Sequence, residues 1–380
     1  MIRFHGVRLL GSGGLSGPQT IEVQAEDADA ERDATGLILS PGWIDLHAHL
    51  RDPGFPESET LATASASAAA GGFTHVVAMA NTNPVTDHAG LVSALLERAA
   101  TMPVRLSVVA ALTERLEGRT LTDADALHQA GAVALSDDGR HAMDRRTLTR
   151  GLQAAGRAGL PVLVHGQLEA LGRDPVAEDS GIAQALEALA DAPGARLHLQ
   201  HVSTRKAVER LRAAKAAGLT VTAEVTPHHL ALTAADVRDG DPNVSPPLRT
   251  SDDRDATVEA LIDGVIDVIA TDHAPHSAAA KAAGSNGYHG LEIAAGVVLG
   301  LQLPWSVLHR ALVTRPAEIL GLGPTHDWIL IDPGERWTVD PTLFASRGRN
   351  TPFAGRQLRG RVTMTLCRNQ VVYREASLVG

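Results

Sequence analysis

An eightfold alternation of apolar, strand-like runs and helix-forming runs occupies most of this chain, from Gly42 to about Gly321. The strand-like runs are mostly continuously apolar, as expected for parallel strands that are covered on both faces. Eight β-α units in succession predict a (β/α)8 barrel of the TIM type, in the α/β class. A doubly wound open sheet is the main alternative, but no Gly-x-Gly-x-x-Gly turn follows the first strand. The predicted strands span residues 44–50, 74–80, 105–111, 132–136, 161–165, 196–201, 220–226 and 267–271.

Both ends of the chain lie outside this alternation and contain short segments of strand-like sequence. These segments are residues 2–9 and 20–24 before the barrel, and 328–331, 361–367 and 370–373 after it. Neither end is long enough to build a stable sheet alone. We therefore predict that residues 1–41 and 322–380 pair into one small β domain, and that residues 42–321 form the barrel.

Composition restricts the cellular location of the protein and the kinds of partner it can bind. The formal net charge of −10, without a basic cluster among aromatic residues, argues against nucleic acid binding. No apolar run approaches the roughly 20 residues that cross a membrane, and residues 1–10 lack the pattern of a signal peptide. Cys367 is the only cysteine, which excludes an internal disulfide and metal chelation by cysteines. The sequence thus predicts a cytoplasmic protein with no membrane partner.

Histidines and carboxylates gather where the predicted strands end. His47 and His49 stand two residues apart, so both imidazoles point to one face of the first strand, and Arg51 follows them. A lone His-x-His pair would be an ordinary polar strand face, but other strand ends add similar residues. Barrel enzymes carry their chemistry at this end of the strands, so these residues are active-site candidates. The set comprises His47, His49, Asn81, Asp137, Asp138, His165, His201, Asp272 and His276.

This set offers nitrogen and oxygen donors and no thiolate. Four of its imidazoles together with two of its carboxylates suit zinc, or manganese or cobalt in its place. Six ligands are too many for one tetrahedral zinc and suit two ions, about 3.5–4 Å apart, that share a bridging carboxylate and a hydroxide. Coordination lowers the pKa of the bound water towards about 7. Asp272, at the last strand end, is placed to touch metal and water together and to carry the proton to a leaving nitrogen.

The motifs around these residues resemble those of dihydroorotases of the bacterial class I type, in the amidohydrolase superfamily. The resemblance spans nearly the whole chain. The matching motifs are Asp45-Leu46-His47-Ala48-His49-Leu50-Arg51-Asp52-Pro53-Gly54, Ala70-Gly71-Gly72-Phe73-Thr74, Asn81-Thr82-Asn83-Pro84, Ser136-Asp137-Asp138-Gly139, His201-Val202-Ser203, Ala223-Glu224-Val225-Thr226-Pro227-His228-His229, Ala270-Thr271-Asp272-His273-Ala274-Pro275-His276 and Asn350-Thr351-Pro352-Phe353.

The resemblance implies a role for each candidate residue. Two Zn²⁺ ions per subunit would be bridged by one carboxylate and a hydroxide, and one acid would serve as the proton shuttle. An arginine fork is an apt partner for the substrate carboxylate. The implied first-metal ligands are His47 and His49, the bridge is Asp138, the second-metal ligands are His165 and His201, and the metal-binding shuttle is Asp272. The implied substrate contacts are His49, Arg51, Asn81, Ser245, His276, Asn286 and Gly287.

Lysine scarcity separates this chain from related families. Hydantoinases, allantoinases, ureases and the other dihydroorotase class resemble this fold but bridge their metals with a carboxylated lysine from the fourth strand. The only lysines here are Lys206, Lys215 and Lys281, and none lies near that strand. Asp137 and Asp138 stand there instead. Asp138 matches the family's bridge, whereas Asp137 would point the other way and order the loop.

Several positions depart from the family pattern. After His165 the family continues with Cys-Glu-Asp, and this chain has Gly166-Gln167-Leu168. Ser245 replaces an asparagine that contacts substrate, and its single hydroxyl makes that contact weaker or water-mediated. The stretch 277–290 is abbreviated, and a Phe-Gly pair appears as Asn286-Gly287. These changes leave the predicted metal ligands intact and concern substrate affinity.

The activity implied by the resemblance is zinc-dependent, reversible hydrolysis of (S)-dihydroorotate to N-carbamoyl-L-aspartate, a step of de novo pyrimidine (UMP) biosynthesis. The metal-bound hydroxide would attack the ring amide. One alternative is a related cyclic amidohydrolase of the hydantoinase or allantoinase kind. Another is an inactive scaffold for aspartate transcarbamoylase, but such relatives have lost metal ligands that this chain retains. The resemblance also implies a homodimer, and it is compatible with association with the transcarbamoylase.

The remaining histidines are expected to have ordinary roles. His228 and His229 follow a strand end, and we expect them to pack near the site rather than to bind metal. His273 lies on the opposite strand face from its neighbours and is expected to be structural. Those expected to be surface or core histidines are His75, His88, His128, His141, His198, His309 and His326.

Overall fold

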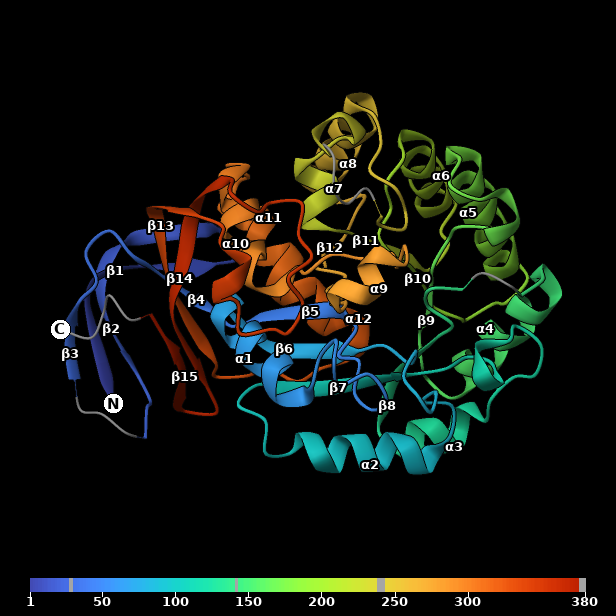
Figure 1. The fold of residues 1–380 in the computed structure, drawn as a ribbon, viewed down its shortest axis with the longest axis horizontal. Coiled ribbons are helices and arrows are strands. Elements are labelled where there is room, and N and C mark those ends of the chain that lie inside the picture. Colours follow the sequence, from blue (N-terminus) through green and yellow to red (C-terminus); the bar gives the residue numbers. More distant parts are fainter. Residues whose placement is uncertain (27–29, 141–142, 238–242, 376–380) are drawn as a thin grey trace.

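The computed structural model describes residues 1–26, 30–140, 143–237 and 243–375, which form a barrel with a second sheet beside it (Figure 1). His141, predicted above as an ordinary histidine, lies outside the described residues. Among the described residues, no helix combines the length and the apolar character needed to cross a bilayer.

The barrel consists of eight parallel strands that neighbour one another in chain order. A doubly wound sheet would reverse its order at a switch point, and this sheet does not. A parallel bridge between Ala48 and His273 joins the first and last strands, so the sheet closes. The predicted barrel is confirmed, and each predicted strand agrees within two residues at either end. The strands are β5 (Trp43–Ala48), β6 (Phe73–Ala78), β7 (Arg105–Ala110), β8 (Ala132–Ser136), β9 (Val162–Val164), β10 (Leu197–Leu199), β11 (Val221–Val225) and β12 (Val268–Ile269).

Helices surround the strands and begin at polar caps. The side chains of Asp144, Thr204 and Thr250 each accept a backbone N–H from the first turn of the helix that follows. Such caps satisfy donors that would otherwise lack a partner. The main helices are α1 (Leu61–Gly71), α2 (Ala89–Ala99), α3 (Ala124–Gln129), α4 (Arg145–Arg157), α5 (Pro175–Ala190), α6 (Arg205–Ala216), α8 (Ser251–Ile262), α10 (Leu291–Gly300) and α12 (Arg315–Leu320).

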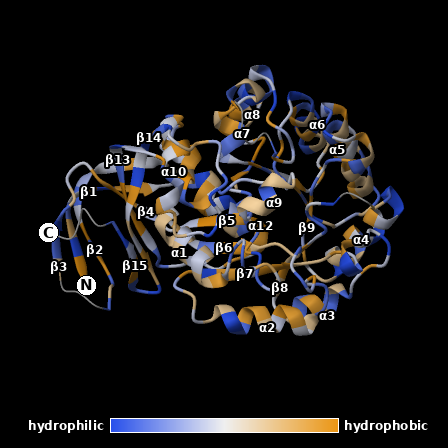
Figure 2. Cartoon of the chain, viewed as in Figure 1, coloured by the Kyte–Doolittle hydropathy of each residue, from blue (hydrophilic) through white to orange (hydrophobic). Residues whose placement is uncertain are grey.

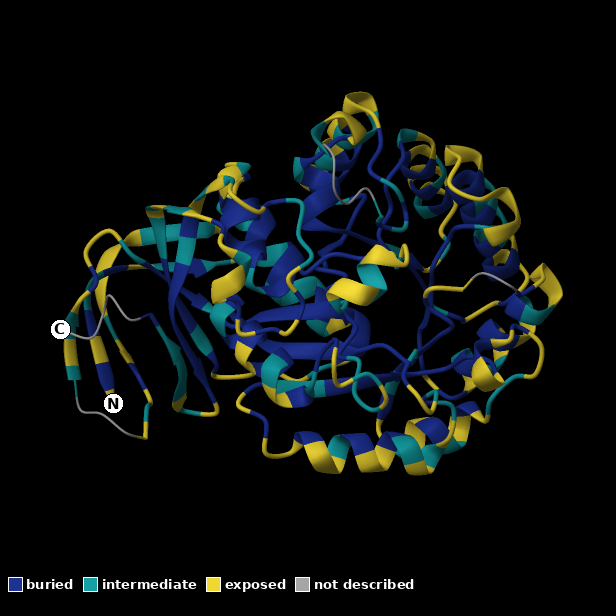
Figure 3. Ribbon diagram, viewed as in Figure 1, coloured by how far each residue is buried: buried dark blue, intermediate teal, exposed yellow. Residues whose placement is uncertain are grey.

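Apolar side chains fill the barrel and the layer between strands and helices. Leu46, Val77 and Leu163 belong to the cluster inside the barrel. A larger cluster, which includes Val76 and Leu152, packs the outer strand faces against the helices. Figure 2 shows the strands as mainly apolar, and Figure 3 shows that exposed residues lie on the outer faces of the helices. The strands are therefore covered on both faces, as their continuous apolar runs indicated.

The second sheet draws its strands from both ends of the chain, as predicted. Its order is β15-β14-β13-β4-β1-β2, and β3 pairs with β1. The two ends meet where β4 pairs antiparallel with β13, with Leu39 opposite Leu330. Phe4, Leu39 and Met364 belong to its own apolar cluster. The strands are β1 (Ile2–Gly11), β2 (Gly14–Val23), β3 (Ala30–Asp33), β4 (Ile38–Pro41), β13 (Trp328–Thr338), β14 (Gln357–Cys367) and β15 (Gln370–Arg374).

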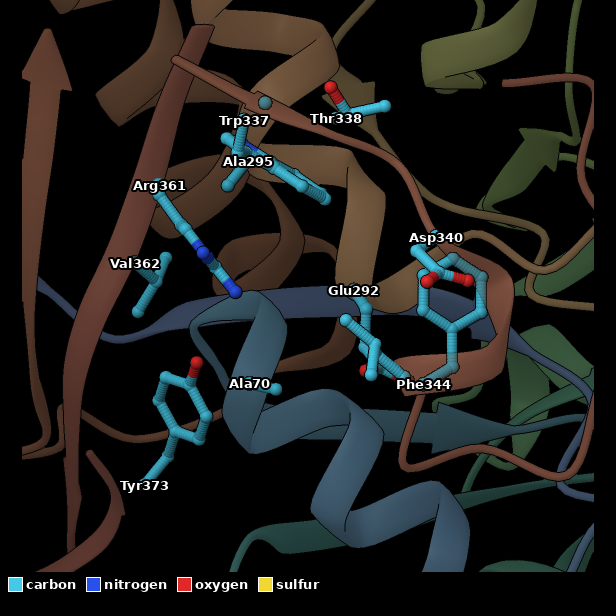
Figure 4. Close-up of a pocket in the computed structure, with 12 residues that line it drawn as sticks. Ala70, Glu292, Ala295, Trp337, Thr338, Asp340, Phe344, Arg361, Val362 and Tyr373 are labelled. Carbon is cyan, nitrogen blue, oxygen red and sulfur yellow. The ribbon is translucent and has the colours of Figure 1, made fainter. Parts of the chain in front are cut away.

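A small cavity of about 120 Å³ marks the junction of this sheet with α1 and α10 (Figure 4). Arg361 lies over the Trp337 ring, 5.1 Å from its centroid, and forms an ion pair of 3.2 Å with Glu335. Glu292 and Tyr373 also line this cavity, whereas none of the predicted site residues does. The predicted chemistry is therefore confined to another part of the molecule.

Candidate active site

A cavity of about 570 Å³ opens at the carboxyl ends of the barrel strands. All the predicted metal ligands and substrate contacts except His47 line this cavity, and His47 is fully buried against two of them. The predicted residues in its lining are His49, Arg51, Asn81, Asp138, His165, His201, Ser245, Asp272, His276, Asn286 and Gly287. The barrel thus gathers residues that lie far apart in the sequence.

Two histidines from β5 face two carboxylates from the ends of β8 and β12. His47 Nε2 lies 3.4 Å from Asp138 Oδ1 and 3.5 Å from Asp272 Oδ1. His49 Nε2 lies 3.2 Å from Asp138 Oδ2 and 3.1 Å from Asp272 Oδ1. Both ring nitrogens therefore converge on the same carboxylates, as the two-residue spacing of the histidines requires.

Two further histidines complete the cluster from β9 and β10. His165 Nδ1 lies 2.8 Å from His201 Nε2, which in turn is 4.0 Å from Asp138 Oδ1. Donor atoms within 4.8 Å of one another form two overlapping groups, one of His47, His49 and Asp272 and one of His47, Asp138 and His201. Each group has three buried side chains able to hold a metal ion.

Hydrogen bonds outside the cluster fix how the β5 histidines face it. Glu224 Oε1 lies 2.5 Å from His47 Nδ1, and Asn81 Oδ1 lies 2.8 Å from His49 Nδ1. Both acceptors hold a proton on Nδ1, so the two Nε2 atoms face the carboxylates. Imidazole nitrogens and carboxylate oxygens that converge in this way need a cation among them. The residues present therefore fit a divalent metal centre.

The charges within the cluster lead to the same conclusion. Burial raises the pKa of Asp138 and Asp272, but His47 and His49 outweigh it and hold both values below the usual range. Burial lowers the pKa of His47, yet the surrounding carboxylates raise it well above its ordinary value. Burial, with His165 beside it, lowers the pKa of His201 to about 3. Without a metal ion the carboxylates thus favour a protonated His47, and a bound cation would take the place of that proton, because ionised carboxylates and neutral imidazoles are the forms that bind metal.

The backbone is strained at three of these positions. Arg51, His201 and Asp272 have φ values of 59°, 33° and 47°, a region that residues other than glycine seldom adopt. Such strain persists only where surrounding contacts enforce it. The buried carboxylate of Asp45 accepts the N–H of Thr271 at 2.8 Å and its hydroxyl at 2.5 Å, immediately before Asp272. This contact anchors the turn that carries the Asp272 carboxylate.

The rim of the cavity carries a guanidinium group. Arg51 Nε donates to the Pro275 carbonyl at 3.2 Å, and Arg51 Nη2 lies 3.2 Å from His276 Nε2. Burial lowers the pKa of Arg51 to about 10, so the group keeps its charge at neutral pH. Burial and the nearby Arg51 charge lower the pKa of His276 to about 4. A cationic fork beside a neutral imidazole suits an anionic group.

Two loops carry the proposed substrate contacts that depart from the family pattern, and the Asn286 carbonyl lies 2.7 Å from His276 Nε2. The Ser245 hydroxyl lies 3.4 Å from Gln167 Oε1. Asn286 and Gly287 lie on a second loop, which begins with the short helix α9 (Ala278–Ala282). Lys281 Nζ donates to the carbonyls of Asn243 at 3.1 Å, Ser285 at 2.8 Å and Gly287 at 3.1 Å, so it holds the two loops together.

Other candidate residues have partners outside the cavity. Asp137 accepts the backbone N–H of Thr113 at 2.9 Å. His229 lies 2.8 Å from Thr226 Oγ1 and 3.1 Å from the Pro246 carbonyl. His273 Nε2 lies 3.2 Å from Glu59 Oε2.

The sequence reasoning missed Glu224, His198 and Lys281. Glu224 contacts both His47 and His198, although His198 had been expected to be an ordinary histidine. An acidic residue inside the apolar run 221–225 is the signal that could have identified Glu224, because a buried carboxylate needs polar partners. Nothing local in the sequence marks the three carbonyl contacts of Lys281.

Comparison with known proteins indicates the family of the chain. The family model described as dihydro-orotase-like matches residues 36–161. The dihydroorotase of Anaeromyxobacter dehalogenans (strain 2CP-C) is 41% identical, over 96% of this chain and 95% of that protein. The dihydroorotase of Thermus aquaticus is 40% identical, over 98% of this chain and 99% of that protein.

The fold also occurs in solved structures of hydantoinases and dihydropyrimidinases. The L-hydantoinase (dihydropyrimidinase) from Arthrobacter aurescens superposes with a TM-score of 0.87 at 25% identity, covering 98% of this chain and 96% of that one. The dihydropyrimidinase from Brevibacillus agri NCHU1002 has a TM-score of 0.84 at 23% identity, covering 98% and 95%, and shows the shared fold alone. Because its near-full-length relatives at about 40% identity are dihydroorotases, the chain belongs to the dihydroorotase family.

Proposed function

We propose that this protein is a dihydroorotase that reversibly hydrolyses (S)-dihydroorotate to N-carbamoyl-L-aspartate in de novo pyrimidine biosynthesis. The observation that carries the proposal is the cavity itself, in which buried histidines and carboxylates lie beneath a charged arginine. The enzyme is a hydrolase of cyclic amide bonds, in keeping with its relatives. A cavity of about 570 Å³ accommodates a small cyclic anion.

The donor set supports a pair of Zn²⁺ ions. His47 and His49 would hold the first ion, Asp138 would bridge, and the imidazoles of His165 and His201 would hold the second, with Asp272 as a further ligand. Such a pair supplies a Lewis acid and lowers the pKa of a water molecule to near neutrality. Cobalt and manganese suit the same nitrogen and oxygen donors.

The chain's own residues would orient the substrate and move the proton. Arg51 and Asn81, with His276 beside them, bind the substrate carboxylate and place the ring amide above Asp272. Asp272 accepts a proton from the attacking water as the new C–O bond forms at the amide carbon. It then gives this proton to the ring nitrogen as the C–N bond breaks. The reverse path closes the ring.

The lysines support this assignment over a lysine-bridged site. Lys206 is 3.2 Å from Asp179, Lys215 is 2.7 Å from Asp267, and Lys281 bonds to loop carbonyls. All three lysines are thus engaged away from Asp138. The bridging position holds a carboxylate, which distinguishes the site from the hydantoinase type described above.

Purified protein supplied with Zn²⁺ should interconvert dihydroorotate and carbamoyl-aspartate, as followed by the ultraviolet absorbance of the ring. The same preparation is assayed with hydantoin and with allantoin. Turnover of either compound with no action on dihydroorotate would refute the proposal and favour a drifted cyclic amidohydrolase. Protein that binds no metal and has no activity would favour the scaffold alternative.

We also propose that the enzyme is a homodimer that can associate with aspartate transcarbamoylase. Light scattering coupled to size-exclusion chromatography measures the mass of the protein alone, which tests the homodimer. The same measurement with added transcarbamoylase tests the association. A monomer mass that the added transcarbamoylase leaves unchanged would reject this assembly.

A further inference from the structure

A buried carboxylate on β11 joins three elements of the candidate metal centre. Glu224 is fully buried, and its Oε1 lies 2.5 Å from His47 Nδ1. The same oxygen accepts the backbone N–H of His201 at 3.3 Å, a residue whose φ is 33°. Glu224 Oε2 lies 3.1 Å from His198 Nε2. One side chain therefore contacts β5 and β10 at the level of the proposed ligands.

The contacts beyond Glu224 fix where the protons reside. His198 Nδ1 lies 2.8 Å from Thr222 Oγ1, and the hydroxyl can donate to this nitrogen. The His198 proton then stands on Nε2, where it is donated to Glu224. Both Glu224 oxygens accept from imidazole N–H groups, so His47 carries its proton on Nδ1. In the neutral ring, which is the form that binds metal, the Nε2 lone pair then faces Asp138, 3.4 Å away.

A competing contact is weaker. The Gln200 amide nitrogen lies 3.3 Å from His47 Nδ1, and it would donate to this atom if the ring proton were on Nε2. A charged acceptor at 2.5 Å forms the shorter and stronger bond. The carboxylate therefore determines the tautomer of the His47 ring.

We propose that Glu224 is a positioning residue that sets the tautomer and orientation of His47, supported by His198 and Thr222, and thereby strengthens metal binding. The inference rests on the metal centre proposed above. Carboxylates that accept the second N–H of a metal-bound histidine raise its basicity and hold its ring. Glu224 itself is not part of the cavity lining.

The test compares zinc affinity in full-length native protein and in Glu224→Gln, by competition with a chromophoric chelator. The amide keeps the size of the side chain but removes the charge that holds the His47 proton. We expect zinc to bind about 10 to 100 times more weakly. The visible spectrum of the Co²⁺-loaded variant should shift, because the His47 ligand changes its orientation. The melting temperature of the metal-free protein, measured in parallel, should change little.

Glu178→Gln is the matched control. Glu178 is also a buried carboxylate, but it accepts the N–H of Ser203 at 2.8 Å and pairs with Arg249 at 3.3 Å instead of a proposed ligand. Its loss should lower the melting temperature and leave the zinc dissociation constant within about twofold. Equal weakening of zinc binding in both variants would overturn the inference, since any buried charge would then have the same effect.

The remaining outcomes are also decisive. Native-like zinc affinity in Glu224→Gln would overturn the inference and leave the proposed function standing. A native protein that binds no zinc would overturn both. If Glu224→Gln does not fold, Thr222→Val is used instead. This variant removes only the Thr222 hydroxyl that contacts His198, and it leaves Glu224 itself in place. We expect a threefold or greater loss of zinc affinity in that variant, and an unchanged affinity rejects the inference.

Discussion

Asp272 leaves the last barrel strand in a left-handed backbone conformation, with its carboxylate 3.1 Å from His49 Nε2. The nearby His47 and His49 keep the pKa of this carboxyl below its usual range, so it is ionised at neutral pH. A single residue at the end of a strand thus combines a strained backbone with a fixed charge. Both features are typical of catalytic groups.

Replacing Asp272 with asparagine should remove proton transfer while preserving the shape of the site. We expect kcat to fall by about 10²- to 10⁴-fold, the usual contribution of a general acid-base group. Steady-state kinetics on dihydroorotate measure this loss, and circular dichroism checks the fold. A variant that retains more than a tenth of the native kcat would exclude Asp272 as the shuttle.

Arg51 is expected to act on binding more than on turnover. Arg51→Lys keeps the charge but loses the planar fork that can bind a carboxylate with two hydrogen bonds. We expect KM for dihydroorotate to rise about tenfold or more, with a smaller change in kcat. Zinc content serves as the control, because Arg51 is not a proposed ligand. An unchanged KM would place the substrate carboxylate elsewhere.

The histidines and aspartates of the cluster could be predicted from sequence because they stand at or just after strand ends, a position that local pattern reveals, whereas Ser245, Asn286 and Gly287 lie on loops and were expected from the family resemblance. Glu224 and His198 could not be assigned in that way. The Glu224 contact with His47 spans 177 positions, and it depends on which strand faces enclose the barrel interior. Sequence periodicity places a residue on a face but does not identify its partner.

At the scale of elements, two loops bearing proposed substrate residues depend on one ammonium group. Lys281 lies on α9 and uses its hydrogen bonds on three carbonyls from those loops. Lys281→Met should loosen the loops and raise KM several-fold while kcat stays within about threefold. Lys281→Arg, which retains donors, should recover part of the loss.

Lys206→Met provides the matched control for this measurement. Its side chain is 64% exposed and, within the described part of the chain, pairs with Asp179 on a neighbouring helix, so its loss should leave the kinetic constants unchanged. Exposed pairs of this kind contribute little. If Lys281→Met leaves KM and kcat unchanged, as Lys206→Met should, the hydrogen bonds of Lys281 to the loops have no part in substrate binding.

The barrel strands were predictable because continuous apolar runs bounded by polar residues leave few alternatives. Helix α9 was not, since five residues of an Ala-rich loop have no amphipathic period. Its single turn is capped by the Ser277 side chain, which accepts the N–H of Ala280 at 3.2 Å. Contacts such as that of Lys281 then decide where so short an element lies.

For the molecule as a whole, acid stability should reflect histidines that the fold keeps neutral. Burial, with Arg105 nearby, lowers the pKa of His75 on β6 from 6.5 to about 4. The unfolded chain therefore binds a proton first as the pH falls. Stability is retained above pH 6.5 and declines between 6.5 and about 4, by about 2 kcal/mol at pH 5.

Urea unfolding of metal-free protein at pH 7 and pH 5 measures this effect. His75→Gln, which can still hydrogen-bond to Ser107, should lose about 2 kcal/mol less than the native protein over the same interval. If the native protein and His75→Gln lose the same free energy of unfolding between pH 7 and pH 5, His75 titrates normally in the folded state and the prediction is wrong.

The C-terminal segment also reaches the barrel at its active face. Glu59, at the start of α1, accepts the Ser346 hydroxyl and the Arg347 N–H, and it contacts His273. Pairing of the terminal segments into one sheet could be predicted from their strand-like sequence. This carboxylate contact could not, because it joins residues 287 positions apart.

The barrel closes where its first and last strands meet, and few main-chain contacts hold that seam. His49 donates its N–H to the His273 carbonyl at 2.7 Å, and Asp45 bonds to Thr271. His49 and Asp272 stand on opposite sides of the seam, 223 positions apart in the chain. Closing so long a loop carries a large entropic cost, so this junction should form late in folding. A cation shared by the two side chains would latch it, and amide hydrogens of β5 and β12 should exchange with solvent sooner once that cation is removed.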